Sequence, residues 1–334
     1  MKNPTRKKFN SLLSHLATLN GVDSVSTAFN VAPAIQQKLE ARLQESSAFL
    51  GSINVIGVDE QSGAKVGIGV SGPTASRTNT QAGGVRKPRN VAASDERGYT
   101  CVQTNFDTQL PYRLLDAWAH RPEFQTLIRD AIVQRQALDR ITIGFNGVNA
   151  AATTDLAANP LLQDVNKGWL QQYRENAPAR VMGKADAKVK VGTASGTDYK
   201  NLDALVMDAI QLLDPWHQGA PDLVVLVGRN LLHDKYFPIV NKDQPNTETL
   251  AADLIISQKR MGNLPAVTVP FLPDNAIFVQ PLSNLSLYWQ IAGRRRYIKD
   301  APEVDAIQNF ESSNDAYVVE DYGRGALIEH IQLM

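Results

Sequence analysis

A pair of β-forming stretches rich in glycine, within residues 51–105, constrains this chain more than any other feature. Valine, isoleucine and glycine dominate residues 53–72, a polar and basic stretch follows over residues 74–97, and β-formers return over residues 99–106. This pattern predicts a long β-hairpin with a large tip. A two-stranded ribbon is marginally stable alone, and its open edges invite unwanted pairing. The hairpin must therefore lie on another surface, either of the same chain or of a neighbouring copy.

Four cationic side chains gather at the predicted tip of this hairpin. They are Arg77, Arg86, Lys87 and Arg89. They could contact acidic residues of a neighbouring subunit, or they could form a solvated loop, and charge patterning favours neither interpretation. The tip is therefore a candidate contact site whose partner the charges alone do not identify.

One short motif in the hairpin matches a cofactor-binding pattern. The segment Gly67-Ile68-Gly69-Val70-Ser71-Gly72 fits G-x-G-x-x-G, the dinucleotide-binding fingerprint. Such glycines bind a pyrophosphate only where a helix N-terminus follows them. Here Pro73 and a polar stretch without helical periodicity follow, which favours a twisted strand containing glycine. A dinucleotide-binding enzyme remains the rival from another functional class, and a helix directly after Gly72 would support it.

The first 50 residues predict an arm without an apparent core of its own. Apolar residues at helical spacing indicate one helix over residues 9–19, and Asn20-Gly21 is a typical stop signal. A linker of small residues spans residues 21–33. A second helix is expected over residues 34–49, so the arm is predicted to consist of two helices on a joint.

The rest of the chain combines one long helix with an α/β pattern. A continuous apolar stripe predicts a helix over residues 121–143, which Gly144 and Gly147 are expected to end. Residues 222–227 contain an unbroken apolar run, typical of a strand buried on both faces. Further strands are expected at residues 266–269, 276–279, 285–289, 296–298, 307–310 and 327–331.

Composition and charge exclude several classes of function. The charges of the 34 basic and 34 acidic side chains cancel, so the formal net charge is zero. A chain without net charge can self-associate without strong repulsion, and it lacks the basic surplus of a dedicated DNA-binding protein. Cys101 is the single cysteine, so neither an internal disulfide nor a cysteine-based zinc site can form. The histidines lack metal-binding spacing and no nucleophile or P-loop motif is present. We therefore expect no catalytic residue, no cofactor and no metal, and no apolar run is long enough to span a membrane.

A basic triplet, Arg294-Arg295-Arg296, follows the strand expected at residues 285–289. It offers a contact to nucleic acid, and it equally fits a charged turn at the surface. Because a lone triplet is a weak signal, the surface turn is the expected arrangement.

Nine longer strings stand in order along the chain. They are residues 144–147 (GFNG), 159–165 (NPLLQDV), 168–171 (GWLQ), 177–182 (APARVM), 222–225 (DLVV), 235–242 (KYFPIVNK), 255–260 (IISQKR), 262–267 (GNLPAV) and 319–322 (VEDY). Together they resemble the major capsid proteins of peduovirus-type temperate tailed phages. The similarity runs from Phe9 to Ile331, and the strings are far more specific than any motif above.

The resemblance implies an α+β chain with the tailed-phage major capsid fold, known as the Hong Kong ninety-seven fold. It implies an N-terminal arm at residues 1–50 and an extended hairpin, the E-loop, at residues 51–105. A peripheral domain at residues 106–200 would contain the spine helix at 121–143. An axial domain would span residues 201–300, and residues 301–334 would return to the peripheral domain.

The resemblance further implies a structural protein of the virion, assembled in the host cytoplasm, and not an enzyme. Copies would form pentamers and hexamers of an icosahedral shell that encloses double-stranded DNA, contacted non-specifically. A scaffold with protease activity and a portal protein at one vertex would be partners, with no membrane involved. The arm would be trimmed, and the small residues around Ala28, Phe29, Asn30 and Val31 are the candidate processing region. An encapsulin-like protein compartment is the alternative function for the same fold.

Overall fold

The computed structural model describes residues 1–65, 69–70, 75–88, 92–93, 97–121, 124–184, 187–240 and 259–334. The α-helices are α1 (Asn3–Asn20), α2 (Pro33–Glu45), α3 (Ala48–Ser52), α4 (Tyr112–Trp118), α5 (Phe124–Asn146), α6 (Trp169–Asn176), α7 (Leu202–Ile210) and α8 (Arg229–Val240). Short 3-10 helices lie at Pro178–Arg180, Leu282–Asn284, Pro302–Val304 and Tyr322–Arg324. None of the helices in these ranges is long and apolar enough to cross a membrane.

Nineteen strands are present in the same ranges. They are β1 (Phe29–Asn30), β2 (Asn54–Val58), β3 (Ser62–Gly63), β4 (Gly69–Val70), β5 (Ala92–Ala93), β6 (Tyr99–Thr100), β7 (Val102–Asn105), β8 (Thr108–Pro111), β9 (Val181–Met182), β10 (Val189–Val191), β11 (Leu223–Val227), β12 (Arg260–Met261), β13 (Leu264–Thr268), β14 (Ile277–Pro281), β15 (Leu285–Gln290), β16 (Arg295–Ala301), β17 (Ala306–Val319), β18 (Ala326–Ile328) and β19 (Ile331–Leu333).

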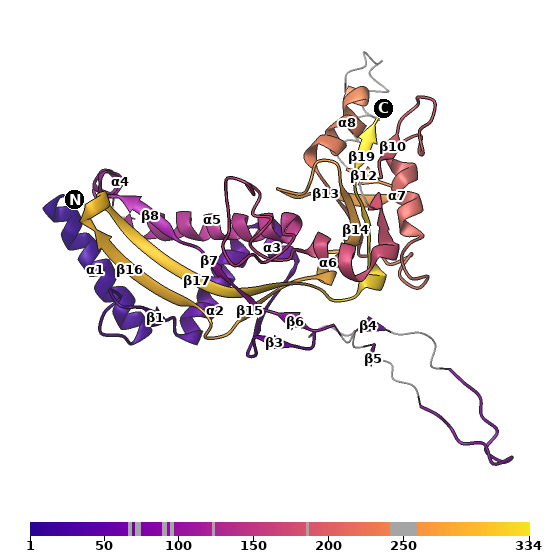
Figure 1. Ribbon diagram of the computed structural model, residues 1–334, viewed down its shortest axis with the longest axis horizontal. Coiled ribbons are helices and arrows are strands. Elements are labelled where there is room, and N and C mark those ends of the chain that lie inside the picture. The colour runs from indigo at the N-terminus through magenta and orange to yellow at the C-terminus, as the bar shows by residue number, and fades with distance from the viewer. Residues whose placement is uncertain are drawn as a thin grey trace.

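Two sheets organise the chain. The first has seven strands, with β1, β16, β17, β15 and β2 in that order and with β7 and β8 also paired to β17. The second has six strands in the order β12, β13, β11, β14, β18 and β9. In Figure 1 the first sheet runs along an elongated body that carries the N-terminus, and the second stands at the other end beside α7, α8 and the C-terminus.

Strand β17 is the axis of the first sheet. It has 14 residues and pairs with β16, β15, β7 and β8. The sequence predicted a strand only at residues 307–310, which is wrong in length. The prediction stopped early because the following residues are polar. Glu311, Ser313 and Asp315 are typical of solvent-facing positions in a sequence, but all three are buried in the structure.

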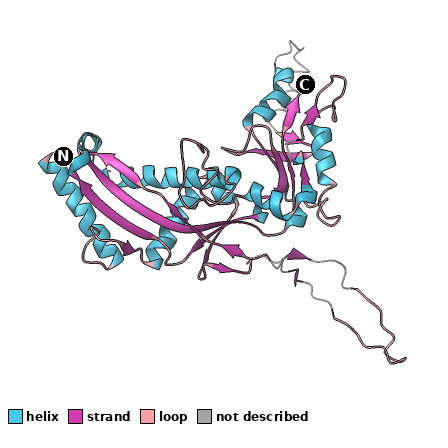
Figure 2. Ribbon diagram, in the orientation of Figure 1, coloured by secondary structure: helices cyan, strands magenta, loops and turns pink. Residues whose placement is uncertain are grey.

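Helices cover one face of the first sheet, where Arg140 of α5 joins Glu40 of α2 to β17, and Figure 2 shows helices beside its long strands. The arm contributes α1 and α2, and the spine is α5. The first arm helix ends at Asn20, and Gly21 continues with a left-handed φ of 65°, as its stop signal predicted. The second predicted helix is interrupted at Ser46 and Ser47, so it forms α2 and α3. The arm shares a core with the body, in which Phe9 and Ala17 pack with Leu115, Ile298 and Ile307.

The second sheet contains the predicted apolar strand β11, which pairs with β13 in parallel and with β14 in antiparallel orientation. Membership of the two sheets crosses the limits of the expected segments. Strand β15 and all but the last residue of β16 fall within residues 201–300 but lie in the first sheet, and β18 falls within residues 301–334 but lies in the second. The reason is long-range pairing, since β18 joins β14 and β9 from distant parts of the chain.

Helix α5 extends three residues beyond the predicted end at 143, through Gly144 to Asn146. Gly144 does not stop the helix, because its role is to make room for Trp169. A Cβ at Gly144 would lie 2.1 Å from Cζ3 of Trp169. The indole stacks edge-on against Phe145 and Tyr317 with ring centroids 5.3 and 5.2 Å apart, which builds the core where α5, α6 and β17 meet.

A buried network of charges joins the arm, the spine helix and the sheet. Arg140 of α5 donates to Glu40 of α2 (2.5 Å) and to Asp315 of β17 (2.9 Å). Arg294 donates to the same Glu40 (2.7 Å) and to Glu311 of β17 (2.7 Å). The two guanidinium groups are 1% and 0% exposed. We call these five side chains the charge network.

The charge network corrects the expected surface turn at residues 294–296. Only Arg295 is exposed, whereas the Arg294 guanidinium also donates to Gln136 of α5 (2.6 Å) and Arg296 donates to Asn309 (2.7 Å). The chain turns back into the sheet at Gly293, and this directs the Arg294 side chain toward α2 and α5. The triplet is therefore split between core and surface.

The charge network also shifts the ionisation of its members. Burial alone would raise the pKa of the Glu311 carboxyl, but the positive charges of Arg294 and Arg296 and hydrogen bonds from Arg294 and Gln136 lower it to about 2. The neighbouring carboxylates of Asp315 and Glu40 outweigh desolvation and raise the pKa of the Arg140 guanidinium. Glu311 and Arg140 are therefore both charged at neutral pH.

Replacing Gly144 with Ala should destabilise the protein even though the site is helical. Alanine is favoured over glycine in a helix by roughly 1 kcal/mol, whereas overpacking a core costs about 1–3 kcal/mol. The clash with Trp169 should dominate and lower the denaturant midpoint. Gly51→Ala is the control, because its Cβ would meet nothing closer than 3.7 Å. Equal midpoints for the two variants would contradict this account of Gly144.

The Glu311→Gln variant should be less stable than the native chain at pH 7 and should lose stability less steeply in acid. The native Glu311 has a lowered pKa, so its contribution is complete above its usual value of 4.5 and disappears as the pH falls toward about 2. That contribution is on the order of 3 kcal/mol. Urea unfolding of both chains across this pH window measures the difference, which should shrink with acidity. A constant difference would contradict the assignment.

Candidate assembly surfaces

The predicted hairpin is present and leaves the body of the protein. Its described rungs pair Ser62 with Thr100 and Gly63 with Tyr99, and further out β4 pairs with β5. Strand β2, which precedes it, pairs in parallel with β15 inside the first sheet. Figure 1 shows the tip residues 75–88 far from both sheets. The hairpin therefore has a fixed root and a tip that its own body does not support.

Aromatic packing fixes the root of the hairpin. The ring of Tyr99 packs edge-on against Tyr288 at 5.0 Å, and its hydroxyl donates to the carbonyl of Glu60 (3.2 Å). Cys101 lies beside them, fully buried, and its amide donates to the carbonyl of Gln61 (2.7 Å). Burial raises the pKa of the Cys101 thiol to about 12, so this thiol is unreactive at neutral pH.

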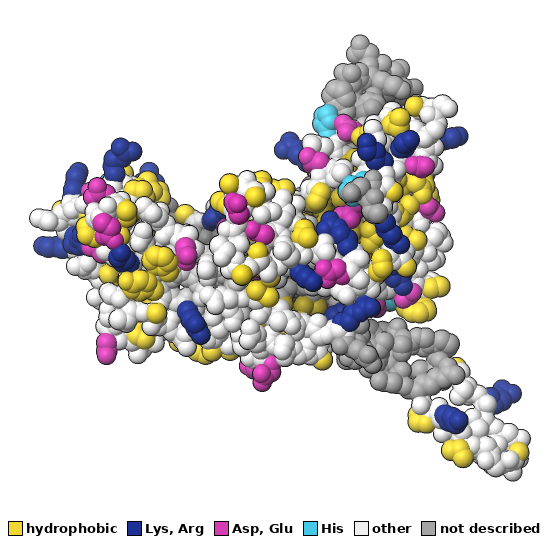
Figure 3. Space-filling model, in the orientation of Figure 1, with side chains coloured by type: hydrophobic (Ala, Val, Ile, Leu, Met, Phe, Trp, Pro, Cys, Tyr) yellow, Lys and Arg dark blue, Asp and Glu magenta, His cyan; other side chains and the backbone are white. Residues whose placement is uncertain are grey.

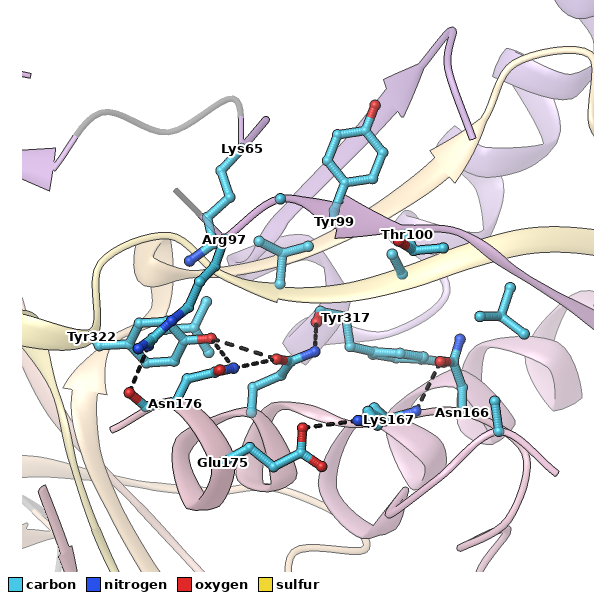
Figure 4. A pocket seen from close by; sticks show the side chains of 17 residues that line it. Lys65, Arg97, Tyr99, Thr100, Asn166, Lys167, Glu175, Asn176, Tyr317 and Tyr322 are labelled. Carbon is cyan, nitrogen blue, oxygen red and sulfur yellow. Dashed lines mark hydrogen bonds and ion pairs between the residues drawn. The ribbon is translucent and has the colours of Figure 1, made fainter. Parts of the chain in front are cut away.

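A polar pocket of about 400 Å³ lies between the root and α6 (Figure 4). Arg97 crosses it from the hairpin and donates to the carbonyl of Asn176 (2.6 Å). The ammonium of Lys65 lies 4.4 Å from the ring centre of Tyr322. On the α6 side, Lys167 pairs with Glu175 (2.9 Å). The contacts of Arg97 and Lys65 tie both hairpin strands to the body and hold the root in place.

The tip carries the cations that the sequence singled out. Arg77, Arg86 and Lys87 are exposed, while Arg89 lies outside the described residues. No acidic residue occurs in residues 75–88, and Figure 3 shows dark blue side chains there without magenta ones. Asn79 shapes the turn, because its side-chain oxygen accepts from the amides of Gln81 (3.1 Å) and Ala82 (3.2 Å). The described tip is therefore a compact positive surface.

The candidate processing region is not the open linker that the small residues suggested. Phe29 and Asn30 form β1 at the edge of the first sheet, opposite Arg296 and Arg295. The amide of Val31 donates to the carbonyl of Arg294 (2.9 Å). Phe29 and Val31 are buried, whereas Ala28 and Asn30 are exposed. A protease would therefore meet this region as a paired strand.

The described residues do not support the interpretation of the glycine motif as a dinucleotide-binding site. Gly67, Ile68, Ser71 and Gly72 lie outside them, and only Gly69 and Val70 are placed, as β4. Residues 75–88 contain turns and extended chain and no helix. Within the described part of the chain, no three His, Cys, Asp or Glu side chains gather in a way that could hold a metal ion.

Comparison with known proteins covers the chain from end to end. Residues 8–331 match the family described as phage major capsid protein, P2 family. A capsid protein of Escherichia phage P2 is 51% identical over 344 residues, covering 100% of this chain and 96% of that protein. The major capsid protein of Serratia phage KSP20 is 44% identical over 342 residues, covering 99% of this chain and 97% of that protein.

Solved capsid structures are also similar to this chain. A chain from the satellite phage P4 procapsid that includes the size determination (Sid) protein superposes with a TM-score of 0.83 at 48% identity, covering 100% of this chain and 99% of that one. The capsid of an empty GTA particle superposes with a TM-score of 0.51 at 15% identity, covering 86% of this chain and 90% of that one, which shows a shared fold alone. The resemblance and the α+β capsid fold predicted from the sequence are thus confirmed. The chain belongs to the P2 family of phage major capsid proteins and is a structural protein of the virion shell, not an enzyme.

Proposed function

We propose that copies of this chain form pentamers and hexamers that close into an icosahedral shell around double-stranded DNA. The observation that carries the proposal is the hairpin, whose cationic tip is exposed and unsupported by its own body. A similar chain is part of the satellite phage P4 procapsid, which supports shell assembly by this one. Each contact can be weak, because in a closed lattice every later contact is effectively intramolecular.

The two sheets suggest how the roles are divided. We infer that the second sheet with α7 and α8 is the axial part, which meets its copies around the five-fold and six-fold positions. The first sheet with α5 is the peripheral part, and the hairpin is the E-loop. The similarity to phage capsid proteins over the whole chain favours this function over an encapsulin-like compartment.

We further propose three partners besides the chain itself. A scaffold with protease activity would guide assembly and trim the arm around Ala28 to Val31. A portal protein would occupy one vertex, and packaged DNA would be contacted without sequence preference. The zero formal net charge supports only a weak, non-specific contact with DNA.

Reversing the tip charges should block assembly without unfolding the chain. The variant Arg77→Glu, Arg86→Glu, Lys87→Glu replaces a positive surface by a negative one, at positions that contact no described core residue. Co-expression with the scaffold, followed by sedimentation and electron microscopy, should show at least a tenfold loss of closed shells. Circular dichroism should remain native. The charge-preserving variant Arg86→Lys, Lys87→Arg is the control and should assemble, and shells of normal yield from the reversed variant would refute a role of the tip.

Trimming of the arm should require β1 to leave the sheet, because proteases bind their substrates as unpaired extended chain. Asn30 and Arg295 are opposite one another across the β1–β16 pair. A disulfide between Asn30→Cys and Arg295→Cys should therefore keep β1 paired, and intact-mass analysis of particles should find the full-length chain. Reduction before maturation should restore trimming, as should the single variant Asn30→Cys. If the oxidised double variant is still trimmed, β1 does not have to leave the sheet before cleavage.

A further inference from the structure

The arm lies on an apolar floor that the body of the chain provides. Figure 1 shows α1 beside β16, with α4 at the same end of the body. The floor is built by side chains of α4, α5, β16 and β17, and they are Tyr112, Leu115, Ile128, Ile298 and Ile307. With the arm in place, each of these five side chains is at most 8% exposed. We call these five residues the arm groove.

Helix α1 fits the arm groove with one face only. Its buried and half-buried side chains recur at helical spacing, and they are Thr5, Phe9, Leu12, Leu13, Leu16 and Ala17. On the opposite face Lys7, Asn10, Ser14 and Thr18 are exposed. An amphipathic helix with its apolar face in a hydrophobic groove is a recurrent way in which one protein binds a peptide of another. The arm therefore has the form of a bound peptide that is still joined to its receptor.

Charges at the start of α1 match the groove. Residues 1–20 contain four basic side chains and no acidic one. The Arg6 guanidinium donates to the carboxylate of Asp300 in β16. The backbone nitrogen of Lys2 donates to the carboxylate of Asp116 in α4 (2.9 Å). Two acids of the body thus hold the basic end of the arm, in addition to the apolar contacts.

These contacts do not depend on the candidate processing region. Phe29 belongs to β1, which must open before a protease can cut there. Val25 lies upstream, is buried, and its carbonyl accepts from the amide of Ile298 (3.0 Å). Residues 26–28 between them are exposed. A cut at or beyond Ala28 therefore breaks the chain without removing α1 or Val25 from the body.

We propose that the excised arm stays bound in the arm groove as a separate peptide, so that each trimmed subunit consists of two noncovalently joined chains. This inference rests on the proposed trimming around Ala28 to Val31 and names the fate of the fragment. Its departure would open the arm groove to water, and soluble proteins rarely expose a contiguous apolar surface. The groove takes the N-terminal fragment of its own copy, because that fragment is already in place when the cut is made.

A cut at a chosen position tests retention without the natural protease. The recognition sequence of a specific protease is inserted between Thr27 and Ala28, and the purified chain is cleaved under native conditions. The fragment and the body should elute together in gel filtration, in equal molar amounts on a denaturing gel, and should separate in urea. Elution of the body without the fragment in native buffer would overturn the proposal, whether or not the natural arm is trimmed.

Two pairs of matched variants of this cleavable chain locate the binding site. Arg6→Glu and Phe9→Ala should each release the fragment about tenfold faster or more after cleavage, since they remove an ionic and a buried aromatic contact. Their neighbours on the exposed face are the controls, and Lys7→Glu and Asn10→Ala should change the rate less than about twofold. Before cleavage the tethered arm keeps all four chains folded. Equal release rates within each pair would contradict binding in the arm groove.

Shells that mature with the scaffold provide a test under natural conditions. Intact-mass analysis of gel-filtered shells should find the N-terminal fragment beside the trimmed chain, at about one copy for each. Trimmed chains without the fragment would refute its retention and leave the trimming itself intact. Chains of full length would refute the trimming instead, and the engineered cut then decides on its own whether the groove retains the arm.

Discussion

Two guanidinium groups buried among three carboxylates connect parts of the chain that the sequence keeps far apart. Glu40 comes from the arm, Arg140 from the spine helix and Glu311 from the long strand, and Arg294 bridges two of them. Removing one partner of such a buried pair leaves an uncompensated charge, which costs about 3–5 kcal/mol. Apolar packing alone would tolerate sliding of α2 over α5. The charge network fixes one register, because Arg140 and Arg294 both donate to Glu40 while each also donates to a different carboxylate of β17.

This register determines which face of the first sheet is free. The odd-numbered side chains of β17 are used for the charge network and the apolar core, so the helices are held on that face. The described helices leave the other face free, and the hairpin root covers one end of it. A rigid body with one used face and one free face can form a curved layer of copies. The hairpin then supplies the only described element that reaches beyond the outline of its own chain.

The sequence predicted those elements whose signal is apolar and local. The stripe of α5, the stop at Gly21 and the buried strand β11 follow from spacing alone. It did not predict β17 in full or the burial of Arg294, since an alternating run of Asn, Glu, Ser and Asp has the same appearance in a solvated strand. The cationic tip was recognised, because its charges lie close together in the sequence, whereas the pairing of β2 with β15 joins segments more than 200 residues apart and has no local signal.

A shell must form reversibly before it becomes permanent, and the distribution of charge in this chain suits that requirement. Its strongest ionic contacts are buried within one copy and are screened little by salt, whereas the tip cations are exposed and their interactions are screened over about 10 Å at 0.1 M salt. Exposed pairs are worth roughly 0–1 kcal/mol each, so a misplaced copy can leave again. Stability then comes from the number of such contacts in the closed lattice, while the charge network keeps every copy in the shape that makes them possible.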